Sequence, residues 1–257
     1  FIEKPPAYDS ASAGQSARNM VASMRHLGYY NSKAEYKADT IETNGQKRVH
    51  VSYRVETGKP TLIDTMSYIM RRPDLQQLAI ENINESYIRK GNPVTKAAVL
   101  GEINRIVNLY RNNGYYKFSS EELIMRGDTT VAALTTITED IFEQLQLLEQ
   151  AKIARDSPTI KLALVLNTPS DSSKLKKYYI NDIYVFPDYR SVNRVSDPNL
   201  LTSYARKRDC DTCRINFYVK YHRKLFRTGF LRRNLYMRKG DLYSQENYYK
   251  TLNSFSR

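Results

Sequence analysis

The sequence lacks most of the side chains on which catalytic and metal sites depend. Its 257 residues include three His and two Cys, and there is no Trp. None of His26, His50 and His222 has a partner at metal-ligand spacing such as His-x-x-x-His. The nucleophile motif Gly-x-Ser-x-Gly, the phosphate-binding loop and the dinucleotide-binding fingerprint are also absent. We therefore expect no enzyme, no cofactor and no metal site.

Long hydrophobic runs are missing as well. No stretch of 18 apolar residues occurs, so the sequence predicts no membrane-spanning helix. Hydrophobic residues make up 41% of the chain, and the mean hydropathy of −0.61 suits small domains with thin cores. The chain begins with Phe1 and has no signal-peptide pattern, so we expect a piece of a longer protein. The 21 Tyr are expected on half-buried strand faces rather than on a tyrosine-rich ligand surface.

What the sequence does contain is an internal repeat. Tyr87-Ile-Arg-Lys-Gly-Asn-Pro-Val-Thr95 and Tyr236-Met-Arg-Lys-Gly-Asp-Leu-Tyr-Ser244 are near copies, and Gly-Tyr-Tyr occurs at 28–30 and at 114–116. Self-similarity of this kind is typical of a chain built from small like units. It favours a modular binding array over an enzyme.

The repeated helices share the same start, face and end. Asp9, Thr95 and Ser244 occupy equivalent N-cap positions, where a side-chain oxygen can accept from free backbone N–H groups. Apolar residues then recur at spacings of three and four, which is one face of an α-helix. A left-handed glycine is expected to end the helices at 28 and 114. We assign structural roles to four glycines of the repeat: Gly28, Gly114, Gly91 and Gly240.

The segments around these helices have strand patterns. Residues 33–41 and 49–55 predict a hairpin that is broken at Gly45, because Val49 to Val55 alternates strictly. Further strands are predicted at 62–70, 118–125, 159–166 and 178–186, and further helices at 73–88 and 139–153. Each unit therefore has the order strand, helix, helix, strand, strand.

That order resembles the polypeptide-transport-associated (POTRA) domain of the BamA/TamA superfamily of outer-membrane assembly proteins. The resemblance rests on Gly-Tyr-Tyr, on the strand 49–55 running into Glu-Thr-Gly-Lys-Pro at 56–60, and on Arg-Lys-Gly-Asp-Leu-Tyr-Ser at 238–244. The segments at 5–9 and 183–189 resemble the TamA-like lipoproteins of Bacteroidetes. The implied fold class is α+β, with tandem POTRA domains, each β-α-α-β-β with a small mixed sheet and two helices on one face.

The resemblance also implies a division of the chain. Residues 1–58 would be a partial first POTRA unit that lacks its opening strand and first helix. Residues 59–170 would be the second unit, with an insertion near 128–156. Residues 171–257 would be a partial third unit, with an insertion near 191–214 and its last two strands missing. The full-length protein is expected to continue into a C-terminal β-barrel, with these units on the periplasmic face of the outer membrane.

Positive charge is concentrated in the last third of the chain. The net charge is +13, and residues 171–257 hold 19 Lys and Arg against 8 Asp and Glu. Residues 1–170 hold 21 against 19. Such a region could bind nucleic acid, an anionic membrane surface, or nothing but solvent. No helix-turn-helix, zinc-finger or RNA-recognition signature is present, so no nucleic acid is predicted. The resemblance favours an anionic lipid surface, since the last POTRA units lie nearest the membrane.

Cys210 and Cys213 form a Cys-x-x-Cys pair in a polar stretch. Three interpretations stay open: a local disulfide or idle thiols, half of a zinc site, and a redox pair. Zinc would need two further ligands, and only His222 is close in sequence.

The resemblance implies a scaffold that binds and hands over unfolded or nascent outer-membrane proteins. The implied mechanism is β-augmentation, in which an extended client adds to an exposed strand edge. The expected edge strands follow each Gly-Tyr-Tyr and include Lys33, Glu35, Lys37, Lys117, Ser119 and Glu121. The alternative is a static docking arm for one periplasmic or inner-membrane partner protein or for the membrane surface.

Overall fold

The computed structural model describes residues 7–43, 45–127, 159–188, 200–205 and 217–256. The chain divides into two compact units. Unit 1 comprises residues 1–105 and 120–168, and unit 2 comprises residues 106–119 and 169–257. The predicted insertion near 128–156, the helix predicted at 139–153, and both cysteines lie outside the described residues.

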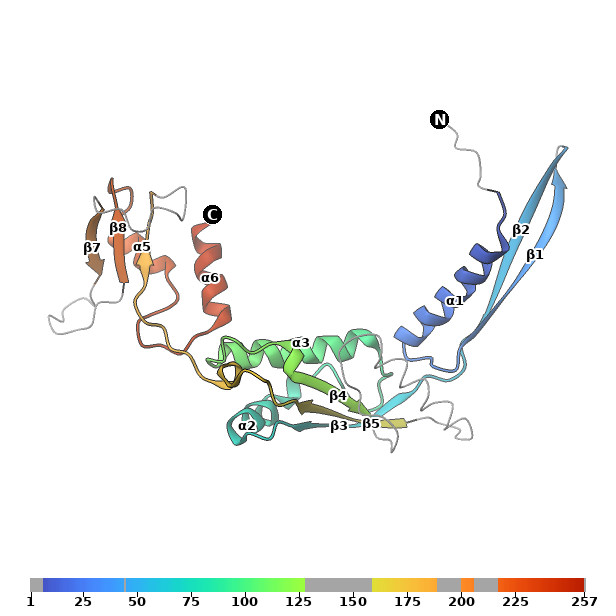
Figure 1. The fold of residues 1–257 in the computed structure, drawn as a ribbon, viewed down its shortest axis with the longest axis horizontal. Helices are drawn as coiled ribbons and strands as arrows, with labels where there is room; N and C mark the ends of the chain where they lie inside the picture. The colour runs from blue at the N-terminus through green and yellow to red at the C-terminus, as the bar shows by residue number, and fades with distance from the viewer. Residues whose placement is uncertain (1–6, 44, 128–158, 189–199, 206–216, 257) are drawn as a thin grey trace. The chain divides into compact units, whose positions relative to one another are not determined.

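Unit 1 begins with one helix lying along a two-stranded hairpin (Figure 1). Helix α1 (Ser10–His26) starts at Asp9, whose carboxylate accepts from the backbone N–H groups of Ala11 at 3.1 Å and Ser12 at 3.0 Å. Strands β1 (Lys33–Thr43) and β2 (Gln46–Glu56) are antiparallel, and Lys33 pairs with Glu56. The predicted hairpin is confirmed, and both strands extend further than the sequence pattern indicated.

The rest of unit 1 is built around a three-stranded mixed sheet. Strand β3 (Leu62–Ile69) is parallel to β5 (Thr159–Leu166), and β4 (Leu123–Gly127) is antiparallel to β5, so the order is β3-β5-β4. Between β3 and β4 come α2 (Pro73–Glu81), the short 3-10 helix η1 (Ile83–Glu85), α3 (Lys96–Asn112) and the 3-10 helix η2 (Ser120–Glu122). The predicted order strand, helix, helix, strand, strand is therefore confirmed here, and the chain is an α+β protein.

The apolar stripe that the sequence predicts on α3 is buried, whereas its counterpart at 245–255 stays largely exposed, with Tyr248 40%, Leu252 47% and Phe255 41% exposed. On α3 the residues Val99 and Ile103 are each 1% exposed. The buried residues from the strands and loops of unit 1 include Ile63, Met70, Ile88, Leu123, Met125, Ile160, Leu162 and Leu164. Helix α3 contributes its first turns to unit 1 and its last residues to unit 2.

Unit 2 contains a second mixed sheet with the order β6-β8-β7. Strand β6 (Tyr184–Val185) is parallel to β8 (Phe217–Tyr221), and β7 (Leu201–Ala205) is antiparallel to β8. The 3-10 helix η3 (Ser172–Leu175) precedes this sheet, and α5 (Thr228–Asn234) and α6 (Gln245–Phe255) follow it. Phe217, Val219 and Leu231 form its core.

The third repeat contains two strands, β7 and β8, that the sequence did not predict. The sheets β3-β5-β4 and β6-β8-β7 have the same strand directions, but β7 and β8 come before α5 and α6 in the sequence, whereas β4 and β5 come after α2 and α3. The stretch expected as an insertion near 191–214 includes β7. The strand predicted at 178–186 shrinks to β6, because the Ile180 N–H and C=O bind Asp241 and Gly240 at 2.8 Å each instead of a strand.

The strand predicted at 118–125 begins later than expected, with β4 at Leu123. Phe118 is fully buried, and its ring packs edge-on against Tyr110 with centroids 4.9 Å apart. Its carbonyl oxygen accepts from Arg111 Nε at 2.6 Å. The backbone is turned back toward α3 at this point, so it is not extended. In consequence Lys117, Ser119 and Glu121 lie outside any strand, which corrects their assignment to an edge strand.

Candidate functional site

The first Gly-Tyr-Tyr triplet joins three distant parts of unit 1. Gly28 ends α1 with φ 95°, and its carbonyl oxygen accepts from the N–H of Thr61, the residue before β3, at 2.9 Å. The Thr61 carbonyl in turn accepts from the Val94 N–H at 2.9 Å. The buried Tyr30 hydroxyl donates to the Val94 carbonyl at 2.7 Å. We call Gly28, Tyr30, Thr61 and Val94 the first junction.

Unit 2 repeats this arrangement with equivalent residues. Gly114 has φ 96°, and its carbonyl accepts from the Tyr178 N–H at 2.8 Å. The Tyr178 carbonyl accepts from the Tyr243 N–H at 2.9 Å. The ring of Tyr116 packs edge-on against Tyr178 and Tyr243, with centroids 5.9 and 4.8 Å away. These residues form the second junction. The repeated motifs therefore couple a helix end to two later segments of the chain through main-chain hydrogen bonds.

The four glycines assigned from sequence all have positive φ. They differ in their surroundings. A Cβ on Gly28 would lie 3.0 Å from Pro93 Cβ and 3.2 Å from the Val94 carbonyl oxygen. A Cβ on Gly114 would lie 2.8 Å from Leu242 Cδ2. Gly91 and Gly240 have nothing within 4 Å of that position, so backbone conformation alone favours glycine there.

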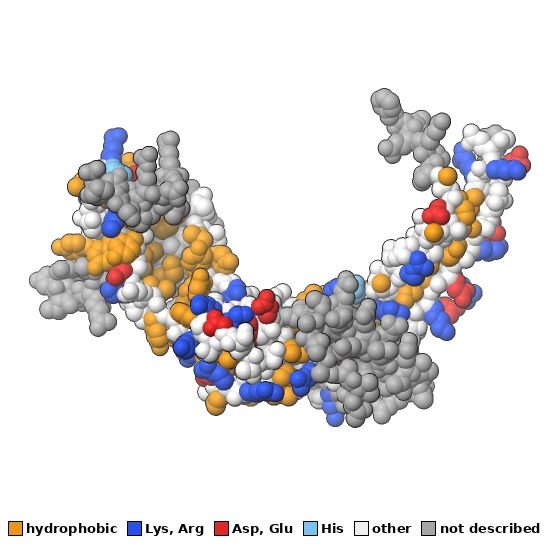
Figure 2. All heavy atoms as spheres, viewed as in Figure 1, with side chains coloured by type: hydrophobic (Ala, Val, Ile, Leu, Met, Phe, Trp, Pro, Cys, Tyr) orange, Lys and Arg blue, Asp and Glu red, His pale blue; other side chains and the backbone are white. Residues whose placement is uncertain are grey.

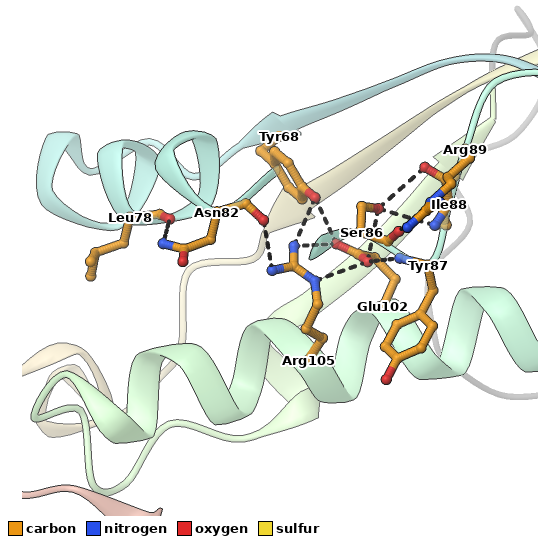
Figure 3. Close-up of polar contacts among 9 residues, drawn as sticks. All are labelled: Tyr68, Leu78, Asn82, Ser86, Tyr87, Ile88, Arg89, Glu102 and Arg105. Carbon is orange, nitrogen blue, oxygen red and sulfur yellow. Dashed lines mark hydrogen bonds and ion pairs between the residues drawn. The ribbon is translucent and has the colours of Figure 1, made fainter. Parts of the chain in front are cut away.

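A buried polar network lies between β3, the loop after α2, and α3 (Figure 3). Glu102 is 0% exposed. Its Oε1 accepts from the Tyr68 hydroxyl at 2.6 Å and from Arg105 Nη2 at 2.7 Å. Its Oε2 accepts from Ser86 Oγ at 2.9 Å and the Tyr87 N–H at 2.9 Å. Sequence reasoning missed this network. One sequence pattern could have indicated it: Glu102 follows Val99 by three residues and so lies on the buried apolar face of α3.

The ionisation of this network follows from its contacts. Burial opposes the charge of Glu102, but the hydrogen bonds from Arg105 and Tyr68 outweigh it and lower the pKa of the carboxyl. Burial, followed by the hydrogen bond to Glu102, raises the pKa of Tyr68 to about 12. Both carboxylate oxygens are occupied by donors from the protein itself. The network therefore stabilises the packing of unit 1 and offers no group to a substrate.

The predicted edge residues divide into two sets. Lys33, Glu35 and Lys37 lie in β1, which pairs with β2 alone among the described strands. Charged side chains of both signs lie along this hairpin (Figure 2), and Lys37 Nζ is 3.0 Å from Asp39 Oδ1. Lys117, by contrast, donates to Ser173 Oγ at 3.0 Å in unit 2. The structure thus leaves three of the six residues on a sheet edge.

A groove of about 600 Å³ lies in unit 2 and was not expected from sequence. Its lining consists of Tyr116, Tyr243, Tyr248, Tyr249, Arg111, Lys117, Lys174, Asp171 and Gln245. Arg111 Nη1 donates to Gln245 Oε1 at 3.1 Å, which holds the guanidinium beside α6. Tyr116 and Tyr243 lie in loops, and Tyr248 and Tyr249 lie in α6. These four tyrosines are therefore not on strand faces, where tyrosine is expected from the sequence.

The described residues show neither a metal-binding cluster nor a membrane-spanning helix. Within residues 7–43, 45–127, 159–188, 200–205 and 217–256, no three His, Cys, Asp or Glu side chains gather where a metal ion could be held. Within the same ranges, no helix is both long enough and apolar enough to cross a membrane.

No model of a known protein family matches the sequence, and no curated protein does. Solved structures that resemble the chain include two of POTRA domains. One is the crystal structure of POTRA domains 3–5 of BamA from Haemophilus influenzae, with 11% identity, a TM-score of 0.40, and coverage of 98% of this chain and 72% of that one. The other is POTRA domains 1–3 of the periplasmic domain of Omp85 from Anabaena, with 12% identity, a TM-score of 0.27 and the same coverage, 98% and 72%.

Proposed function

We propose that this chain is a non-enzymatic periplasmic scaffold of the BamA/TamA superfamily, which binds and hands over outer-membrane protein segments by β-augmentation. The proposal depends on one edge of strand β1 that has no described strand partner. This strand has 11 residues, and its only described strand partner is β2. An open edge of that length offers a row of main-chain donors and acceptors to an extended client.

The side chains of β1 suit an edge that accepts clients transiently. Lys33, Glu35 and Lys37 are exposed, and charges of both signs discourage permanent pairing between copies of the chain. Main-chain hydrogen bonds do not depend on the client's side chains, so many different sequences could bind. Helix α1 contacts both strands of the hairpin. A client strand would therefore extend an already supported sheet.

The division into POTRA units at 1–58, 59–170 and 171–257 belongs to this proposal, as does the periplasmic location. The repeated junctions support the division, because each joins a helix end of one repeat to the first residues of the next. Kinship with the TamA-like lipoproteins is proposed on the segments 5–9 and 183–189.

A pair of proline variants tests the mechanism. Adjacent residues of a strand direct their N–H groups to opposite edges. Of Lys37→Pro and Ala38→Pro, one therefore removes a β1–β2 ladder bond and the other removes only an outward donor. We expect the first to lower the melting temperature. We expect the second to melt near the parent and to lose most cross-linking to an extended peptide of alternating apolar and polar residues.

Lys37→Ala is the matched control, since it removes the charge and keeps the donor. It should cross-link like the parent. If both proline variants retain peptide cross-linking, or if the cross-links map to α1 instead of β1, edge augmentation is the wrong mechanism.

The docking arm is the second candidate, and the tyrosine groove of unit 2 favours it. A groove with three cations and one carboxylate among its tyrosines suits one partner with acidic and aromatic side chains. A docking arm should bind a single partner tightly, whereas a scaffold should bind many extended peptides weakly. Tyr249 is 52% exposed, and Tyr249→Ala should weaken binding to that single partner and leave the binding of extended peptides unchanged.

A further inference from the structure

The segment 222–233 of unit 2 connects β8 to α5 and includes most of that helix. It lies in a stretch without acidic residues, because no Asp or Glu occurs between Asp211 and Asp241. The same stretch holds nine basic residues: Arg214, Lys220, Arg223, Lys224, Arg227, Arg232, Arg233, Arg238 and Lys239. We call residues 222–233 the basic tip.

Three large apolar side chains are exposed within the basic tip. Leu225 is 52% exposed, Phe226 44% and Phe230 40%. The rings of Phe226 and Phe230 stack with centroids 5.5 Å apart and planes 19° from parallel. They thereby form one apolar surface, with Leu225 adjacent in sequence. An exposed apolar cluster bordered by polar residues marks an interaction site.

The basic tip is held by the core of unit 2. Leu231, next to Phe230, is 2% exposed and packs in the cluster with Phe217 and Val219. At the other end, Asp188 Oδ2 accepts from the backbone N–H groups of His222 at 2.6 Å and Arg223 at 2.9 Å. These contacts fix both ends of the loop. Phe226 and Phe230 are therefore presented to solvent by a folded element.

The cations of the basic tip are exposed at the surface. The side chains of Arg223, Lys224, Arg227, Arg232 and Arg233 form no ion pair with any residue that the structure describes. Five such cations and three exposed apolar side chains fall within the same twelve residues. This composition matches an interfacial membrane site, where cations bind phosphate and aromatic rings enter the headgroup region.

We propose that the basic tip is a membrane-surface anchor, which inserts Leu225, Phe226 and Phe230 into the interface of an anionic phospholipid bilayer. The five surrounding cations bind the lipid phosphates. A duplex nucleic acid would use the cations but would leave Leu225 without a role. The anchor uses other residues than the edge of β1, so this proposal does not depend on β-augmentation being correct.

The absence of Trp permits a direct test on the full 257-residue chain. Phe226→Trp places a single fluorophore in the basic tip, and Phe255→Trp places one at a residue of similar exposure on α6, 41% against 44%. With vesicles of equal parts phosphatidylcholine and phosphatidylglycerol, we expect the emission of Phe226→Trp to shift to shorter wavelength. Brominated lipids should quench it. Phe255→Trp should show neither effect.

Paired substitutions then separate insertion from general charge. Leu225→Ser with Phe226→Ser should lower vesicle partitioning at least about tenfold, because each buried apolar side chain contributes strongly. The matched control is Leu252→Ser with Phe255→Ser, an equally exposed Leu and Phe on α6, and it should partition like the parent.

The charge pair Arg223→Gln with Lys224→Gln should lower partitioning about 25-fold, since each cation near an anionic surface contributes about fivefold. Lys176→Gln with Arg238→Gln is the control outside the basic tip and should have a smaller effect. Equal losses from both pairs, no Trp shift, or tighter binding to duplex DNA than to the vesicles would overturn the proposal.

Discussion

Two requirements favour glycine at position 28: a left-handed backbone conformation and little space for a side chain. The φ of Gly28, 95°, lies in the left-handed region, and a Cβ there would lie 3.0 Å from Pro93 Cβ and 3.2 Å from the Val94 carbonyl oxygen, so that these neighbours would have to move. The first requirement is local and follows from ending a helix with a turn. The second arises because a loop more than sixty residues later packs against the same atom.

Comparing Gly28→Ala with Gly91→Ala separates these two costs. Gly91 has φ 82° and open space around its Cα, so its replacement should cost only about 1 kcal/mol of unfolding free energy for the strained backbone. Gly28→Ala should cost at least about 2 kcal/mol, because the rigid neighbours must also move. Urea unfolding of the two variants measures the difference. Equal costs would mean that the close approach at the first junction is absent in solution.

At the scale of elements, the junctions explain why the repeat contains both Gly-Tyr-Tyr and Arg-Lys-Gly. In the first junction Gly28 and Val94, about 65 residues apart in sequence, both bind Thr61, the residue before β3, and Val94 follows Arg-Lys-Gly by three residues. Neither motif could be interpreted alone. The second junction uses equivalent backbone bonds but a different aromatic contact, since Tyr30 is buried and Tyr116 is 52% exposed.

Tyr30→Phe tests the first junction as an element contact. The change removes the hydroxyl that donates to the buried Val94 carbonyl at 2.7 Å. Leaving that acceptor unpaired should cost about 1–2 kcal/mol of unfolding free energy. Tyr29→Phe is the control, because Tyr29 is half-buried and its hydroxyl makes no hydrogen bond within the described residues. It should unfold like the parent in the same urea titration.

An edge strand can begin later in the sequence than predicted and still occupy the expected place in its sheet. Strand β4 lies at the edge of the sheet, as the resemblance implied, but it begins after η2. Phe118, where the predicted strand began, lies outside the strand and is buried against Tyr110. The test of β-augmentation therefore belongs on β1, where the three remaining edge residues lie.

For the whole molecule, carboxylates in both units make the fold sensitive to acid. The pKa of Asp9 is lowered by its hydrogen bond from Ser12, that of Asp171 by Ser173, and that of Asp188 by the Arg223 N–H. The pKa of Glu102 is also lowered. A carboxyl whose pKa falls on folding stabilises the folded state fully above its unfolded pKa, about 4. That stabilisation is lost as the pH drops through the folded pKa.

We therefore expect unfolding free energy to be level near neutral pH and to fall below about pH 4. Glu102→Gln should lower it at neutral pH by about 3–5 kcal/mol, because Arg105 stays buried without its partner. The same variant should show a shallower decline in acid, since one titrating carboxyl is gone. Circular dichroism across a pH series measures both effects. An unchanged acid slope would mean that Glu102 does not titrate with folding.

The sequence by itself determined the local features of this protein. Asp9, Thr95 and Ser244 cap helices as predicted, and the β-α-α-β-β order of 62–166 follows from periodicity and turn residues. Caps, stripes and left-handed glycines depend on residues a few positions apart, so their pattern is visible in one chain.

Only the tertiary structure decided which distant residues meet. The pairing of Gly28 with Thr61, the burial of Glu102 beneath Tyr68, and the position of β7 and β8 ahead of their helices all depend on contacts across many residues. No periodicity encodes such contacts. The basic tip shows both levels: its charge could be counted in the sequence, but the stacking of Phe226 on Phe230 beside a buried Leu231 appears only when the chain is folded.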